Sequence, residues 1–250
     1  IGKGHKVGLF LPNCPLSVIA YYGILRTGAS VVNFNPLYAE DELAHQILDS
    51  ETDIMVTLDL AMMMDKMLIM LEKTPLKKII VGQFSQFLGF PKNILFPIVK
   101  HKDITKFESS DKIVPLAKFL DNDGQVDAVE IAHDDLAVLQ YTGGTTGAPK
   151  GAMLSHRNIY VNALQCYANF PDPDMDINGG HEKMLAVLPF FHVFAMTVCL
   201  NMAVLAGMEI VTLPRFNLDG ALKLLHKKRP AYMPAVPAIF TAINHYTSLD

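Results

Sequence analysis

Residues 7–58 read VGLFLPNCPLSVIAYYGILRTGASVVNFNPLYAEDELAHQILDSETDIMVTL and alternate between two patterns. Short, uninterrupted apolar runs are typical of strands buried on both faces, and the segments between them carry apolar residues at helical spacing. Strands separated by helices of this length favour right-handed crossovers and a parallel sheet covered on both sides. The alternation therefore predicts an α/β fold.

The same alternation continues along most of the chain. In the first part we expect strands at residues 7–11, 30–34, 54–58, 78–81, 136–141 and 150–154, and helices at 16–26, 40–49, 61–72 and, behind Ser155, 156–169. A second series is expected to have strands at 185–188, 209–213 and 231–233, and helices at 193–206, at 218–228 behind Asn217, and from Pro237 onward. Residues 171–180, rich in Pro, Asp and Gly, read as a linker. We therefore divide the chain into an α/β subdomain at 1–178 and an incomplete one at 179–250.

Composition excludes several classes of protein. Of the 250 residues, 50% are hydrophobic and 18% charged, which is too apolar for a disordered chain. The net charge of −4 gives no reason to expect nucleic acid as a partner. Cys14, Cys166 and Cys199 lie far apart and form no CxxC pair, so the sequence indicates neither a disulfide framework nor a zinc site. We expect a reducing, cytoplasmic location.

Two segments bear on membrane association. The nearly uncharged residues 184–208 are interrupted by Pro189, His192 and Asn201, which favours a buried core helix over a membrane span. Residues 84–107 read FSQFLGFPKNILFPIVKHKDITKF and interrupt the α/β pattern as an inserted excursion. We favour a loop packed on its own domain, and keep as an alternative that its aromatic and basic residues contact a membrane surface.

The chemistry is concentrated in residues 139–151, which read LQYTGGTTGAPKG after an apolar strand. Glycines allow backbone N–H groups to approach a polyphosphate closely, threonine hydroxyls add donors, and a lysine adds a positive charge. A Walker A loop is excluded, because Pro149 precedes Lys150, Gly151 follows it, and the chain continues as a strand. The pattern predicts an anion-binding loop.

These residues resemble the signature phosphate loop of the adenylate-forming enzymes, which include acyl-CoA ligases, luciferases and the adenylation domains of peptide synthetases. Four further motifs of that family occur in the expected order, one before the loop and three after it: LRTGASVVNFNP at 25–36, LSHRN at 154–158, LPFFHVF at 188–194 and PAVPAIF at 234–240. The amino-acid sequences of these motifs and the aromatic insertion at 84–107 are most similar to those of the bacterial long-chain fatty-acid-CoA ligases. The resemblance implies part of a large N-terminal domain built from two flavodoxin-like, parallel-sheet α/β subdomains, the second incomplete here.

The resemblance also implies a two-step reaction. A fatty acid and ATP give acyl-AMP and pyrophosphate, and coenzyme A then gives acyl-CoA and AMP, with Mg²⁺ as a further cofactor. A carboxylate is already an anion at pH 7, so its attack on the α-phosphorus needs no general base. Catalysis can then rest on positioning and on stabilising charge over the phosphates.

Site residues are implied by position in the motifs. The ATP phosphates are assigned to Thr142, Gly143, Gly144, Thr145, Thr146, Gly147 and Lys150. The catalytic residues are Lys150, which neutralises departing pyrophosphate, and His192, which contacts the carboxylate and α-phosphate. The acyl pocket is assigned to Phe194, Met196 and Val236, and no residue is assigned to a metal.

Several alternatives remain open. The chain begins at Ile1 and contains no Tyr-Gly-x-Thr-Glu or Thr-Gly-Asp segment, so we expect a fragment that does not turn over alone. The substrate could instead be an aromatic or medium-chain acid, and the chain could be a non-catalytic nucleotide-binding module. A homodimer and a peripheral position at the inner membrane, through residues 84–107, also stay open.

Overall fold

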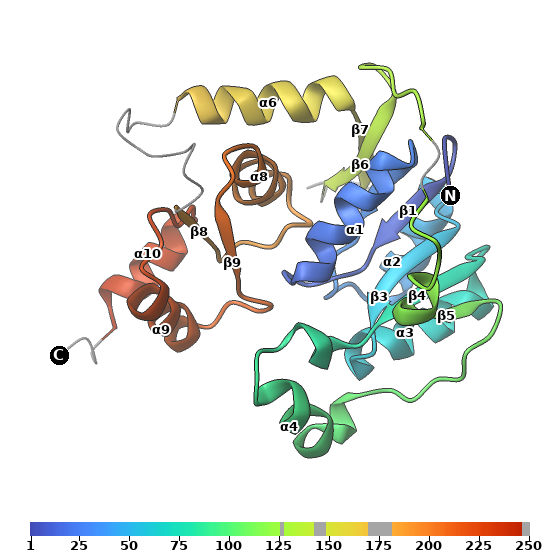
Figure 1. The fold of residues 1–250 in the computed structure, drawn as a ribbon, viewed down its shortest axis with the longest axis horizontal. Coiled ribbons are helices and arrows are strands. Elements are labelled where there is room, and N and C mark those ends of the chain that lie inside the picture. The colour runs from blue at the N-terminus through green and yellow to red at the C-terminus, as the bar shows by residue number, and fades with distance from the viewer. Residues whose placement is uncertain (126–127, 143–148, 170–181, 247–250) are drawn as a thin grey trace. The chain divides into compact units, whose positions relative to one another are not determined.

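The computed structural model describes residues 1–125, 128–142, 149–169 and 182–246 (Figure 1). The chain forms two compact units. The first comprises residues 1–11 and 15–156, and the second comprises residues 12–14 and the chain from 157 onward. The expected boundary at 178/179 falls in a segment outside the described residues and stays a prediction.

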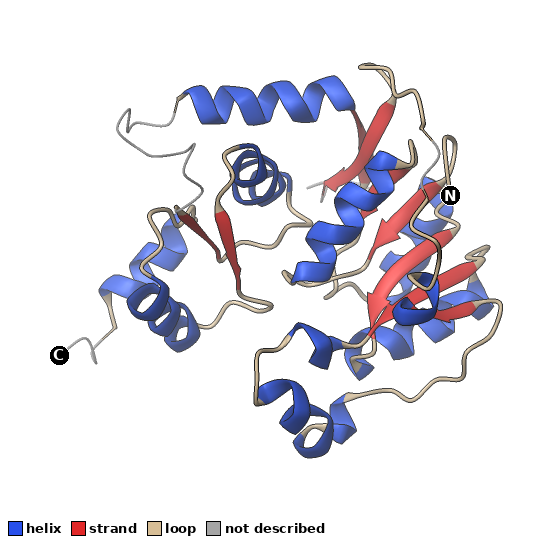
Figure 2. Cartoon of the chain, viewed as in Figure 1, coloured by secondary structure: helices blue, strands red, loops and turns tan. Residues whose placement is uncertain are grey.

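In the described residues of the first unit, seven strands form one sheet in the order β5-β4-β3-β1-β2-β6-β7 (Figure 2). The strands are β1 (Lys6–Leu9), β2 (Ser30–Asn33), β3 (Ile54–Leu58), β4 (Lys78–Gly82), β5 (Ile113–Pro115), β6 (Leu136–Thr142) and β7 (Lys150–Ser155). The section β2-β1-β3-β4-β5 has the flavodoxin order and is parallel throughout. β6 adds parallel to β2, whereas β7 is antiparallel to β6 and closes a hairpin.

Helices cover both faces of this sheet, as the right-handed crossover rule requires. The main ones are α1 (Pro15–Arg26), α2 (Glu40–Ser50) and α3 (Ala61–Lys73), and α5 (Leu116–Phe119) is a shorter fourth helix. α2 packs against α3, and α1 and α5 line one apolar cavity, so each pair shares a face. Gly28 ends α1 with a positive φ of 77°, and its N–H donates to the Leu25 carbonyl at 3.0 Å.

The excursion at 84–107 is helical rather than a plain loop. It contains the 3₁₀ turns η1 (Phe84–Phe87) and η2 (His101–Asp103) on either side of α4 (Lys92–Val99). It contributes no strand, as expected. None of the residues of α4 is fully buried, so the segment packs on its own unit less closely than we expected.

The second unit is built around the parallel pair β8 (Lys183–Ala186) and β9 (Glu209–Thr212). Its helices are α6 (His156–Ala168), whose first residue lies in the first unit, α7 (Val193–Ala195), the π-helical segment η4 (Met196–Met202), α8 (Ala203–Leu205), α9 (Leu218–Lys228) and α10 (Pro237–Asn244). A core of Leu185, Val187, Val211, Ala221 and Ile239 packs α9 and α10 against one face of the pair. Met184 and Ala186 point to the opposite face and are also buried, and η4 packs against β8.

The structure differs from the sequence-based expectation in three further places. β5 and α5 were not expected, because three-residue and four-residue elements are too short to show a period. β7 runs antiparallel, whereas the expected sheet was parallel. The expected strand at 231–233 is a single bridge between Tyr232 and Met184, since Pro230 and Pro234 on either side lack N–H donors.

Candidate functional site

The anion-binding loop predicted from sequence connects the two strands of a β-hairpin. Thr142 ends β6 and Lys150 begins β7, and these two residues pair directly across the hairpin. Both are exposed. Gly143, Gly144, Thr145, Thr146 and Gly147 lie outside the described residues, so their contacts stay predictions. The hairpin brings the two described members of the set together at the mouth of the loop.

Tyr141 holds the base of this hairpin in place. Its buried ring lies opposite Gly151, where a Cβ atom would come within 3.0 Å of two ring atoms. Its hydroxyl donates to the carboxylate of Asp49 near the end of α2. Burial, and then the hydrogen bond to Asp49, raises the pKa of the Tyr141 phenol, so that the hydroxyl stays a donor into alkaline solution. The end of β6 is therefore held by contacts with both β7 and α2.

A chain of buried side-chain amides connects α2 and β2 to β6, the first strand of the hairpin. Gln46 donates to the backbone carbonyl of Asn33 at 2.9 Å, and the Asn33 amide donates to the Gln140 side chain at 3.0 Å. These residues belong to α2, β2 and β6, and all three are buried. Asn33 and Gln140 lie at the carboxyl ends of neighbouring parallel strands, the edge at which open α/β sheets bind ligands.

In the second unit, His192 follows β8 and immediately precedes α7, as expected. Its backbone N–H donates to the Pro189 carbonyl at 3.0 Å, and its carbonyl accepts from Met196 N–H at 2.9 Å. The ring of Phe191 packs beside its imidazole, with the ring centroids 4.4 Å apart. Partial desolvation lowers the pKa of the His192 imidazole, although the residue remains exposed on one side. A neutral, accessible imidazole can donate one hydrogen bond and accept another.

Asn13 fixes the path of the chain from β8 toward His192. Its buried amide nitrogen donates to the carbonyls of Ala186 at 3.1 Å and Leu188 at 2.7 Å, and its oxygen accepts from Phe190 N–H at 2.8 Å. Asn13 is not among the site residues expected from the sequence. The signal available was a polar residue four positions after the last residue of β1 in the sequence, since sheets of this class carry their ligands beyond the carboxyl ends of their strands.

The three residues assigned to an acyl pocket have different surroundings. Met196 is buried at the start of η4, whereas Phe194 in α7 and Val236, just before α10, are exposed. Cys199 is buried in the same helical stretch as Met196, and burial raises the pKa of its thiol to about 12. The π-helical turn follows His192 within four residues, and such turns are frequent at functional sites. The pocket assignments stay predictions.

The described residues fit a nucleotide phosphate better than they fit a bare metal. Lys150 is exposed and forms no ion pair with any residue that the structure describes, so its charge is available to an anion. Within the described ranges, no three His, Cys, Asp or Glu side chains gather as metal ligands. We therefore assign Mg²⁺ to none of these residues.

No helix among the described residues has both the length and the apolar run that crossing a bilayer requires. The stretch around Met184–Met208 is instead divided into β8, a loop and a helix, as its interruptions predicted.

Comparisons with known proteins cover nearly the whole chain. A Bacillus subtilis protein named long-chain-fatty-acid–CoA ligase is 38% identical over 253 residues, covering 99% of this chain and 44% of that protein. An Escherichia coli O157:H7 protein of the same name is 35% identical over 249 residues, covering 96% and 43%. The chain thus spans less than half the length of these relatives.

Solved structures agree with this result. A crystal structure of a long-chain-fatty-acid-CoA ligase from Archaeoglobus fulgidus is 28% identical, with a TM-score of 0.69 over 97% of this chain and 42% of that one. The family model described as AMP-binding enzyme matches residues 1–250. The chain therefore belongs to the AMP-binding family of adenylate-forming enzymes.

Proposed function

We propose that the complete protein containing this chain activates a long-chain fatty acid with ATP and transfers the acyl group to coenzyme A. The observation that carries the proposal is the TGGTTGAPK connection of the β6–β7 hairpin, clamped at its base by Tyr141 and Gly151. The names of the relatives that are 35% and 38% identical support the choice of substrate.

In the proposed first step, a carboxylate oxygen of the fatty acid attacks the α-phosphorus of ATP. The new P–O bond gives acyl-AMP, and pyrophosphate leaves with the electrons of the broken bond. No proton has to be removed from a carboxylate, so the protein's task is to align the reactants and to stabilise charge. The hairpin loop and Lys150 would hold the phosphates, while His192 would donate its imidazole N–H to an oxygen at the reacting centre.

In the proposed second step, the sulfur of coenzyme A attacks the acyl carbon of acyl-AMP. The thioester forms, AMP leaves, and the thiol proton is released to solvent. Nothing in the described residues is assigned to coenzyme A. The tunnel for the acyl chain is proposed to include Phe194, Met196 and Val236, at the start of the helix after His192 and before α10.

The test is acid-dependent exchange of pyrophosphate into ATP by the complete protein, which reports the first step alone. Palmitate, oleate, octanoate, acetate and p-coumarate are compared at equal concentration. Exchange that peaks with palmitate or oleate supports the proposal. Exchange with coumarate or short acids alone keeps the adenylation chemistry and overturns the substrate, and no exchange with any acid favours a non-catalytic nucleotide-binding module.

Lys150→Met and Lys118→Met form a matched pair for the site. Both lysines are exposed, but Lys118 lies in α5, whereas Lys150 begins β7 at the mouth of the loop. Removing one stabilising charge from a transition state costs on the order of a hundredfold in rate. We expect that loss for Lys150→Met and unchanged exchange for Lys118→Met, and equal rates for both would remove Lys150 from the site.

A further inference from the structure

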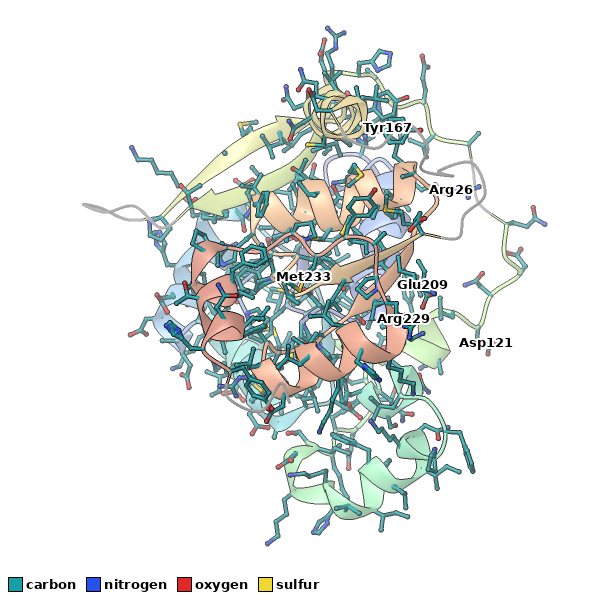
Figure 3. The ribbon with its side chains drawn as sticks, turned by 90° about the vertical axis from the view of Figure 1, so that its left-hand side faces the viewer. Arg26, Asp121, Tyr167, Glu209, Arg229 and Met233 are labelled. Atoms are coloured by element: carbon teal, nitrogen blue, oxygen red, sulfur yellow. The ribbon has the colours of Figure 1, made fainter. Side chains whose placement is uncertain are left out.

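The α4 segment carries an apolar surface that no described residue of its own unit covers. We call it the α4 patch, and it consists of Phe90, Ile94, Leu95, Ile98 and Val99, which are 83%, 56%, 49%, 66% and 68% exposed. Within the first unit, Figure 1 shows α4 standing away from the seven-stranded sheet, and Figure 3 shows side chains surrounding the same green segment. Single exposed apolar residues are ordinary, but a contiguous group marks an interaction surface.

Helical geometry explains why these side chains share one face. Ile94 and Ile98 are four residues apart, as are Leu95 and Val99, so the four cover an arc of roughly 140° on α4. Phe96 falls outside this arc and turns inward, where its ring meets that of Phe84 edge to face with centroids 5.1 Å apart. Phe96 thus packs α4 against η1, and the apolar arc is exposed.

The charge of residues 84–107 indicates which kind of partner the α4 patch has. Lys92 begins α4, and Lys100, Lys102 and Lys106 follow its end, against Asp103 as the one acidic residue of residues 84–107. The segment therefore has a formal charge of +3 in a chain whose net charge is −4. Lys100 forms an ion pair with Asp103 at 3.4 Å, and no described residue forms an ion pair with the other three lysines.

We propose that the α4 patch inserts into the surface of an anionic lipid bilayer, with α4 lying in the plane of the interface. Aliphatic side chains on one face of a short helix reach the boundary between headgroups and acyl chains, and lysines of the same segment attract anionic headgroups. A protein partner would account for the apolar arc, but the four lysines favour a negatively charged surface. This inference goes beyond the proposed function and does not depend on it, because vesicle binding requires no catalysis.

The experiment is co-sedimentation of the complete protein with phosphatidylcholine vesicles, with and without phosphatidylglycerol. We expect binding to the anionic vesicles that weakens as ionic strength rises. The double variant Ile94→Ser, Ile98→Ser should bind about tenfold more weakly or worse, because it removes buried CH₂ groups from the interface. The matched control is Leu48→Ser, Met62→Ser, which changes two helical residues of similar exposure, 55% and 51%, outside the patch.

A charge variant tests the lysines of residues 84–107 separately. Lys92→Gln, Lys102→Gln, Lys106→Gln should weaken binding to anionic vesicles by roughly a hundredfold. Lys118→Gln, Lys223→Gln, Lys227→Gln removes the same charge elsewhere and should leave binding intact.

Four outcomes would overturn the proposal. Three of them concern vesicles: absence of binding by the unmodified protein, equal binding by the Ile94 and Leu48 double variants, and equal binding to neutral and anionic vesicles. The fourth is that the unmodified protein binds no vesicles but self-associates in light scattering, and that Ile94→Ser, Ile98→Ser abolishes this self-association, which would assign the patch to a second copy of the chain.

Discussion

Asn13 Nδ2 donates a hydrogen bond of 2.7 Å to the carbonyl oxygen of Leu188, which lies 175 positions later in the sequence. The same amide group also donates to Ala186 and accepts from Phe190, so one side chain satisfies three backbone groups on the way to His192. A buried polar group needs such partners, and the segment from β8 to His192 receives several of them from Asn13. The position of the His192 backbone therefore depends on a residue near the N-terminus of the chain.

Replacing Asn13 with alanine should destabilise the protein. A buried backbone group that loses its partner costs about 1–3 kcal/mol, and Asn13→Ala removes three hydrogen bonds at once. We expect the midpoint of urea unfolding to fall and pyrophosphate exchange to fall with it. Asn93→Ala, at an exposed position of α4, should change the free energy of unfolding by less than about 0.5 kcal/mol. Similar midpoints for the two variants would contradict the role of Asn13.

Gly151→Ala and Gly23→Ala should have opposite effects. The added methyl group at residue 151 would lie 3.0 Å from the Tyr141 ring, closer than side chains normally pack, and should cost about 1–3 kcal/mol. Gly23 lies in α1 with open space around it, so alanine there should stabilise the helix by about 0.5–1 kcal/mol. Thermal unfolding of both variants measures this difference, and stabilisation by Gly151→Ala would contradict the proposed clamp.

Tyr141→Phe should lower stability and change its dependence on pH. The hydrogen bond to Asp49 is lost, which costs about 1.5–3 kcal/mol when the acceptor is a carboxylate. The pKa of Tyr141 is raised in the folded state, so its contribution is fully present below the ordinary phenol pKa of about 10 and is lost as pH rises above it. Urea titrations at pH 8 and above pH 10 should show a steeper alkaline loss in the unmodified protein than in Tyr141→Phe. Parallel losses in both proteins would contradict the assignment.

His192 should act in its neutral form. Desolvation lowers the pKa of its imidazole below the ordinary value of about 6.5, so the ring is uncharged at neutral pH and gains a proton only in more acidic solution. Pyrophosphate exchange should therefore hold steady around pH 7 and decline as pH falls through the lowered pKa, because the protonated ring can still donate a hydrogen bond but can no longer accept one. His192→Ala should reduce exchange by about ten- to a hundredfold and flatten this acidic limb. An acidic limb that persists unchanged in His192→Ala would assign the titration to another group.

The three cysteines should differ in reactivity. Cys14 and Cys199 are buried, and burial raises the pKa of the Cys199 thiol to about 12, so almost none of it is thiolate at pH 8. Cys166 in α6 is partly exposed. Iodoacetamide followed by peptide mass mapping should label Cys166 first, and the other two only after unfolding. Early labelling of Cys199 would contradict the packing of the π-helical segment.

Sequence reasoning located most elements because their signals are local. β3 and α9 match their predicted ranges, and Asn217 caps α9 by accepting from Gly220 N–H at 2.7 Å. α10 begins at Pro237 as predicted, since proline is suited to the first helical turn. Periodicity and capping depend on residues within one or two turns, so they can be recognised without the tertiary structure.

The amino-acid sequence by itself determined the α/β class, most strand and helix positions, the glycine-rich loop between β6 and β7, and the family motifs. The tertiary structure decided the direction of β7, the reduction of residues 231–233 to one bridge, the contact of Asn13 with Leu188 and the outward face of α4. These features depend on which distant segments come into contact. Strand pairing, buried hydrogen bonds and side-chain exposure are properties of the packed chain, whereas propensity and period are properties of its neighbouring residues.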